Sequence, residues 1–224
     1  SKIAAVGAGV GLLFGKTKYI FAALKVTKLS TVISLVLSSA AYAMFFGWPY
    51  AVGMVSQIFL HESGHALMMI RHRIPTSPMV FIPFVGAFVA VAQGSFRTAW
   101  IEAQVAIAGP IAGLLAASGF TYAGISTNSQ LCFALAQFGY MINLFNMIPV
   151  GQLDGGRILG ILSKWWLVAG LGLGGTYFMA SDHTNPMMVM ILLASSYFTY
   201  VRFTDPTSVG YSAQYLNIPK TQKI

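Results

Sequence analysis

Long apolar runs place the strongest constraint on how this sequence folds. Hydrophobic residues make up 56% of the 224 residues, and charged residues make up 8%, against about a quarter in a soluble domain. Runs of roughly 17–25 apolar residues are long enough to cross a bilayer as helices. The sequence therefore predicts an all-α polytopic membrane protein with about six transmembrane helices. The candidate spans are Leu29 to Phe46, Tyr50 to Ile70, Ala103 to Ile125, Leu131 to Ile148, Trp165 to Ser181 and Pro186 to Val201.

The basic residues follow the pattern that sets membrane topology. The chain has 13 Lys and Arg residues against 5 Asp and Glu residues. With a cytoplasmic N-terminus and six crossings, every basic residue falls on the cytoplasmic side, as the positive-inside rule requires. We therefore expect a multi-pass protein of the cell (inner) membrane, with both termini cytoplasmic and the lipid bilayer as its surroundings. Charges placed at the ends of apolar runs argue against a nucleic-acid partner.

The stretch from Pro78 to Ala92 differs from the predicted spans. It is apolar, but Pro83 and Gly86 interrupt it, and it is rich in the Val, Ile and Phe residues that favour strands. If it crossed the membrane, several later basic residues would move outside, against the rule. We therefore predict a small re-entrant membrane β-hairpin. Non-helical backbone at membrane depth requires protein or a wet cavity beside it, so the hairpin also predicts a cavity.

Residues 61 to 65 read His-Glu-Ser-Gly-His, inside the second predicted span. On a helix, His61 and His65 lie one above the other, so their imidazoles can converge on one metal ion. Glu62 lies about 60° around the helix from His65 and is close enough to reach a water on that metal. We interpret Glu62 as a base and not as a ligand. The alternative is that the histidines form packing hydrogen bonds across a helix bundle.

A catalytic zinc site takes three protein ligands and leaves one position for water. The single Cys132 excludes a cysteine-based zinc cluster. Asp154 is the best candidate for the third ligand, because it arrives on the inner half of the membrane, where His61 and His65 also lie. Pro149 and the neighbouring glycines end the preceding helix there. The candidates that fit less well are His72, Glu102, Asp182, His183 and Asp205.

Asn143 and Asn146 lie on the span before Asp154, three residues apart. In the functional interpretation, an Asn amide near the metal donates to a substrate carbonyl or to the oxyanion formed when water attacks. In the structural interpretation, these side chains cap a helix or form hydrogen bonds between helices. The sequence leaves both interpretations open for each residue.

The chain resembles the site-2 proteases, a family of intramembrane zinc metalloproteases. The resemblance extends from about Trp48 to Lys164, and relatives commonly have Pro where this chain has Gln152. It rests on His61-Glu62-Ser63-Gly64-His65, on Asn146-Met147-Ile148-Pro149 with Leu153-Asp154-Gly155-Gly156-Arg157, and more weakly on Gly109-Pro110.

The resemblance implies a role for each of these site residues. His61, His65 and Asp154 would bind Zn²⁺, Glu62 would be the catalytic acid and base, and Asn146 would contact substrate near the scissile bond. The family likeness also implies a membrane-embedded strand where the hairpin is predicted. An edge strand within Val80 to Val91 would hold an unwound substrate by backbone hydrogen bonds.

We therefore expect an endopeptidase that cuts within or near transmembrane segments of membrane-protein substrates. Three segments are predicted: a basic interfacial segment at 1–28, an intramembrane metalloprotease domain at 29–203 and a polar tail at 204–224. One rival interpretation is a membrane transporter that binds a metal ion for passage. Another is an inactive protease-like protein that binds membrane helices without cutting them.

Overall fold

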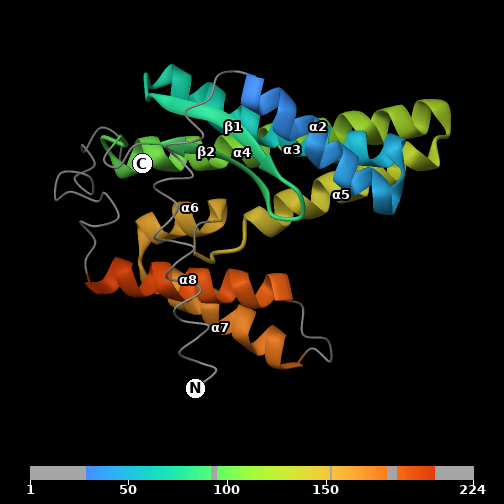
Figure 1. The fold of residues 1–224 in the computed structure, drawn as a ribbon. Coiled ribbons are helices and arrows are strands. Elements are labelled where there is room, and N and C mark those ends of the chain that lie inside the picture. The colour runs from blue at the N-terminus through green and yellow to red at the C-terminus, as the bar shows by residue number, and fades with distance from the viewer. Residues whose placement is uncertain (1–28, 92–94, 152, 181–185, 205–224) are drawn as a thin grey trace.

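The computed structural model describes residues 29–91, 95–151, 153–180 and 186–204 (Figure 1). The predicted interfacial segment 1–28, the tail beyond Thr204 and the residue Gln152 lie outside the described residues. Seven helices and two strands are present in the described part. They are α2 (Leu29–Phe46), α3 (Trp48–Arg71), β1 (Thr76–Ile82), β2 (Gly86–Val91), α4 (Ala99–Thr127), α5 (Gln130–Asn146), α6 (Asp154–Leu162), α7 (Trp165–Ala180) and α8 (Pro186–Thr204).

Six of these helices fall on the six predicted spans, while α6 is an additional short helix. Pro149 and the glycines that follow it were expected to end the helix before Asp154. Helix α5 does end just before them, at Asn146. The chain then starts a new helix at Asp154. Among the described residues, α4 is the one helix that is long and apolar enough to cross a membrane by length and composition alone. The six crossings therefore stay a prediction.

The hairpin predicted between Pro78 and Ala92 is present as an antiparallel pair, β1 and β2. Its turn includes Phe84 and Gly86, both of which have positive φ angles, 63° and 124°. Helix α2 runs along β1 (Figure 1) and bonds to its backbone. Thr31 Oγ1 donates to the Met79 carbonyl at 2.8 Å, and the Phe81 N–H donates to Ser34 Oγ at 3.2 Å. The outer edge of β1 is therefore covered by α2.

The strand register fixes which backbone groups of β2 point away from the hairpin. Phe81 pairs with Ala87, and Met79 pairs with Val89. Phe81 and Met79 direct their backbone groups toward α2, so these are the pairs of the antiparallel ladder that exchange no hydrogen bonds. Ala87 and Val89 must then direct their N–H and C=O groups to the opposite edge. That edge of β2 is the free edge of the sheet.

The helices pack through small residues and one apolar cluster. Tyr42, Met54, Val55, Phe81 and Leu135 are buried together and join α2, α3, β1 and α5. Helix α3 crosses α4 closely at Gly64, where an added Cβ would meet the carbonyl carbon of Ala108 at 2.8 Å. Helices α7 and α8 pack against each other, and α7 also packs against α6 (Figure 1). Helix α6 also packs against α4, so it lies between α4 and the pair formed by α7 and α8.

The close contact at Gly64 predicts a stability effect. Gly64→Ala should lower the free energy of unfolding by about 1–3 kcal/mol, because the added methyl group must push α3 away from α4. Thermal unfolding in detergent measures this change. Gly119→Ala on α4 is the control, because nothing lies within 4 Å of an added Cβ at that position. An equal fall in the melting temperature of both variants would contradict the packing argument.

Candidate metal centre

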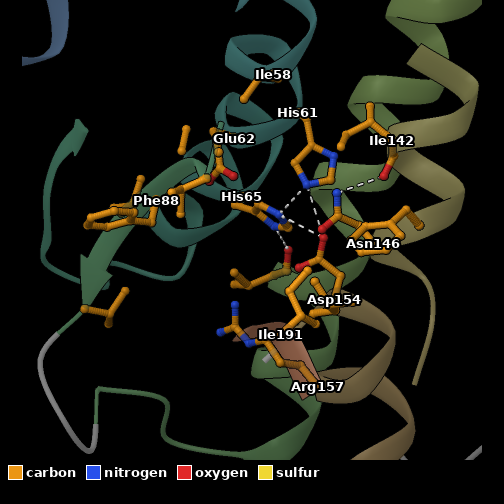
Figure 2. A pocket seen from close by; sticks show the side chains of 18 of the residues that line it. Ile58, His61, Glu62, His65, Phe88, Ile142, Asn146, Asp154, Arg157 and Ile191 are labelled. Carbon is orange, nitrogen blue, oxygen red and sulfur yellow. Dashed lines mark hydrogen bonds and ion pairs between the residues drawn. The ribbon is translucent and has the colours of Figure 1, made fainter. Parts of the chain in front are cut away.

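Helix α3 brings the two histidines of the His-Glu-Ser-Gly-His segment together. His61 and His65 are both buried, and their rings meet edge to face with centroids 4.9 Å apart. Their Nε2 atoms lie 3.1 Å from each other. Glu62 is half-buried on the same helix and faces the cavity described below (Figure 2). The helical spacing thus produces the convergence that the sequence predicted.

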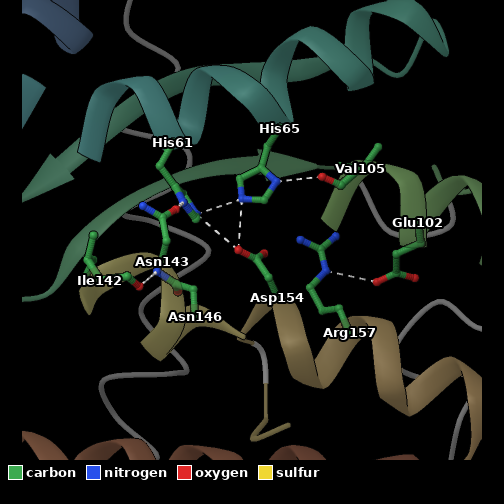
Figure 3. Close-up of polar contacts among 9 residues, drawn as sticks. All are labelled: His61, His65, Glu102, Val105, Ile142, Asn143, Asn146, Asp154 and Arg157. Carbon is green, nitrogen blue, oxygen red and sulfur yellow. Dashed lines mark hydrogen bonds and ion pairs between the residues drawn. The ribbon is translucent and has the colours of Figure 1, made fainter. Parts of the chain in front are cut away.

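Asp154 reaches the histidines from the first turn of α6 (Figure 3). Its Oδ2 atom lies 3.2 Å from His61 Nε2 and 3.3 Å from His65 Nε2. The approach depends on the two glycines that follow. A Cβ at Gly155 would collide with the Met147 carbonyl, and one at Gly156 would lie 2.6 Å from the Gly151 carbonyl oxygen. The loop after α5 can fold tightly enough to deliver Asp154 only with glycines there.

The far side of each imidazole is held by a hydrogen-bond acceptor. His65 Nδ1 lies 2.7 Å from the Val105 carbonyl oxygen. His61 Nδ1 lies 2.8 Å from Asn143 Oδ1, and the Asn143 amide nitrogen donates to the Gly139 carbonyl at 2.7 Å, which identifies Oδ1 as the acceptor. Both Nδ1 atoms therefore donate, and in each neutral imidazole the lone pair lies on Nε2. The two lone pairs face Asp154 Oδ2.

Asp154 supplies a negative charge to this cluster. It lies in α6, outside the predicted membrane spans. Burial raises the pKa of the Asp154 carboxyl, but hydrogen bonds and charge attraction from His61 and His65, when their Nε2 atoms carry protons, outweigh burial and lower that pKa to about 2. The carboxylate is therefore ionised at neutral pH. When a metal ion replaces the Nε2 protons, the two imidazole nitrogens and the carboxylate oxygen can each donate an electron pair to it.

This donor set fits a zinc ion. Zinc bonds to histidine nitrogen and carboxylate oxygen at about 2.0–2.2 Å, so tetrahedral ligands lie about 3.3–3.5 Å from one another. The three donor atoms here are separated by 3.1, 3.2 and 3.3 Å. Among the described residues, His61, His65 and Asp154 form a group whose ligand atoms are close enough together to hold one metal ion. Two histidines and one carboxylate are also a ligand set that catalytic zinc sites use.

The two asparagines have different surroundings. Asn143 is buried, 6% exposed, and its carbonyl contacts His61, while Gly113 on α4 leaves room for its amide group. The structure thus places Asn143 behind a predicted metal ligand, where it orients His61. Asn146 lines the cavity and donates from Nδ2 to the Ile142 carbonyl at 2.9 Å. Its predicted contact with substrate stays a prediction.

A cavity of about 570 Å³ opens beside the cluster (Figure 2). Strand β2 lines it with Ala87 and Val89, so the free edge of the sheet faces this space. Most of the lining is apolar and comes from β2, α3, α5 and α8. The polar and charged lining residues are His61, Glu62, His65, Asn146, Asp154 and Arg157.

The sequence analysis missed an ion pair next to the cluster. Arg157 Nε donates to Glu102 Oε1 at 3.2 Å (Figure 3), and the Glu102 side chain is 7% exposed. From the sequence, Glu102 was considered only as a less suitable candidate for the third metal ligand. An acid in an apolar segment does indicate a buried partner, but the choice of Arg157 depends on how α4 and α6 pack.

The fold places a buried His-His-Asp cluster within a helical scaffold, and comparisons with known proteins find similar sequences and a similar fold. Residues 49–130, which include His61, Glu62 and His65, match peptidase family M50. A solved structure, the site-2 protease from Methanocaldococcus jannaschii, has a TM-score of 0.50 and 18% sequence identity. The similarity covers 76% of this chain and 86% of that chain, and it shows a common fold. The resemblance to the site-2 protease family, a membrane-embedded family of metalloproteases, is confirmed.

Relatives of known sequence agree with this result. Zinc metalloprotease MJ0392 from Methanocaldococcus jannaschii is 30% identical over 138 residues, which are 59% of this chain and 38% of that protein. Stage IV sporulation protein FB from Bacillus subtilis is 32% identical over 107 residues, which are 47% of this chain and 37% of that protein. The chain spans 29% to 38% of the length of the curated relatives that it matches.

The contact between Asn143 and His61 predicts a change in zinc affinity. Asn143→Ala should weaken zinc binding about 10- to 100-fold, because the acceptor that orients the His61 ring is lost. A competitive chelator titration of the purified protein measures the affinity. Asn146→Ala is the matched control, because Asn146 bonds to its own helix and should leave zinc affinity unchanged. Equal affinities for wild type and Asn143→Ala would contradict the orienting role.

Proposed function

We propose that this chain is an intramembrane zinc endopeptidase. Its substrates would be other membrane proteins, cut within or near their transmembrane segments. The observation that carries the proposal is the convergence of His61, His65 and Asp154 in one cavity that also receives Glu62. The name of zinc metalloprotease MJ0392 supports zinc as the metal. We also propose a multi-pass location in the cell membrane, with both termini cytoplasmic.

The residues divide the chemistry among themselves. His61, His65 and Asp154 would hold zinc. The zinc ion would act as a Lewis acid and lower the pKa of a bound water toward about 7. Glu62 faces the same cavity and would accept a proton from the attacking water. It would then return that proton to the leaving amine. Asn146, on the cavity wall, would donate its amide hydrogen to a substrate carbonyl.

Separating zinc binding from proton transfer tests the enzyme assignment. Glu62→Gln should keep zinc but lower cleavage of a membrane substrate by about 100-fold or more, because the amide cannot accept the proton. His61→Ala should lose both zinc and cleavage. Metal analysis of the purified protein and product detection by mass spectrometry measure the two properties.

The same experiment separates the rival functions. A metal transporter would bind zinc but release no peptide products, with or without Glu62. An inactive helix-binding protein would retain membrane peptides without cutting them. Wild-type protein that is loaded with zinc and yields no products from any membrane peptide would overturn the protease proposal.

Strand β2 is suited to hold an extended substrate segment. A helical peptide bond is shielded by its own hydrogen bonds, so a transmembrane helix must unwind before it is cut. The outward N–H and C=O groups of Ala87 and Val89 face the cavity and would pair with the unwound segment by strand addition. Helix α2 already satisfies the other edge of the sheet, so β2 provides the available edge.

Removing one outward donor tests strand addition. Val89→Pro removes the N–H that faces the cavity and leaves the hairpin bonds of β1 and β2 in place, as proline at an edge position allows. Cleavage should fall about 3- to 10-fold, the value of one hydrogen bond, with zinc content unchanged. Val89→Ala keeps the N–H and controls for the lost side chain. Equal cleavage by the two variants would count against strand addition.

A further inference from the structure

Arg157 occupies a position that the proposed chemistry does not use. We propose that Arg157 is a substrate-binding residue whose guanidinium donates hydrogen bonds to main-chain carbonyl groups of the extended substrate. These carbonyl groups would lie on the substrate edge that faces away from β2. The inference rests on the proposed function and deepens it, because it names a second contact that an unwound transmembrane segment makes in the cavity.

Two contacts fix the guanidinium of Arg157. Its Nε donates to the buried carboxylate of Glu102 at 3.2 Å, and its plane lies over the ring of Phe96, with 5.4 Å between Cζ and the ring centroid. Glu102 belongs to α4, and Phe96 precedes that helix. A side chain held on two sides loses little conformational entropy when it binds a ligand. Arg157 is therefore preorganised at the cavity wall.

The fixed guanidinium lies beside the reacting groups. Arg157 lines the cavity together with Glu62 and Asp154. Figure 2 shows Asp154 and Arg157 below the two histidines and Phe88 of β2 to their left. A segment paired with β2 would therefore run between the sheet edge and the wall that carries Arg157.

An extended substrate segment paired with β2 needs hydrogen-bond donors on the cavity wall opposite β2. A strand has two hydrogen-bonding edges, and β2 satisfies only one of them. A carbonyl group left without a hydrogen-bond partner in an apolar cavity is unfavourable. A guanidinium offers five N–H donors and stays charged at every accessible pH. Among the described residues that line the cavity, Arg157 is the single Lys or Arg.

The ion pair with Glu102 explains why the positive charge of Arg157 is tolerated in a mostly apolar cavity. An isolated buried charge is costly, whereas a paired one is not. The carboxylate neutralises the charge of Arg157, and the contact between the two residues is made through Nε, one of the five N–H donors of the guanidinium. The pair thus presents donors to neutral carbonyl groups and does not select for acidic side chains. The substrate class that fits is an apolar segment recognised through its backbone.

Peptide binding in an inactive background tests the inference. The probe is a fluorescently labelled, Leu-rich transmembrane peptide with a central Gly-Pro break, titrated into detergent-solubilised Glu62→Gln protein loaded with zinc. Adding Arg157→Met should raise the Kd of this peptide about 10-fold and leave zinc affinity within about twofold, since the loss of one charged hydrogen bond is on the order of 1.5–3 kcal/mol. In the active protein, Arg157→Met should raise KM for the same peptide.

Two further variants identify the cause of any change. Lys164→Met removes a nearby cation that contacts Phe203 at 4.2 Å and does not line the cavity, so it should leave the Kd unchanged. Arg157→Lys keeps a donor and a positive charge and should restore part of the binding. If Arg157→Met weakens zinc and peptide binding in parallel, Arg157 positions Asp154 through α6 and the inference is overturned.

The outcome for Arg157 is separate from the outcome for the proposed function. Wild-type protein that cuts the peptide, with an Arg157→Met variant of equal Kd and KM, would overturn the inference alone. Wild-type protein that holds zinc but never cuts would overturn the proposed function, whatever Arg157 does to peptide binding.

Discussion

The convergence of three buried electron-pair donors on one point is the constraint on which the site depends. The Nε2 atoms of His61 and His65 and the Oδ2 atom of Asp154 lie within 3.3 Å of one another. In a water-poor interior such a group is unfavourable unless a cation lies among the donors, because burying an ionised carboxylate alone costs several kcal/mol. A bound metal ion would attract all three donors, so metal binding would also stabilise the fold. The hydrogen bonds behind the two rings hold the donors in place.

Helix α4 supplies none of the proposed ligands, yet one of its faces supports all of them. Glu102, Val105, Gly109 and Gly113 are spaced by three or four residues and therefore share a face. Val105 accepts from His65, and Gly109 leaves room for the His65 ring. Gly113 leaves room for Asn143, which contacts His61, and Glu102 pairs with Arg157 on the helix of Asp154. The positions of the three donor atoms therefore depend on how α4 packs against its neighbours. By length and composition, α4 is also the described helix best suited to span a membrane.

The sequence predicted those features that depend on local spacing. Helix positions followed from apolar length, the hairpin from residue type and topology, and the convergence of His61 and His65 from helical periodicity. Asp154 required a further argument, which combined a missing third ligand with the expected side of the membrane. The contact between Asn143 and His61, and that between Glu102 and Arg157, depend on how α3, α4, α5 and α6 pack. No local pattern encodes such a contact, because each partner alone resembles an ordinary cap or membrane-edge charge.

The hairpin shows how polar backbone is confined to the site. Large apolar side chains such as Leu37, Leu115 and Met179 are exposed on the helices, as lipid-facing positions require. An unpaired strand edge among such surfaces would be unstable in lipid, where nothing satisfies its N–H and C=O groups. Hydroxyl groups of α2 satisfy the β1 edge, and the β2 edge faces the cavity that holds Glu62 and the metal-binding cluster. The unpaired strand edge and the ionisable side chains are therefore both confined to this one cavity.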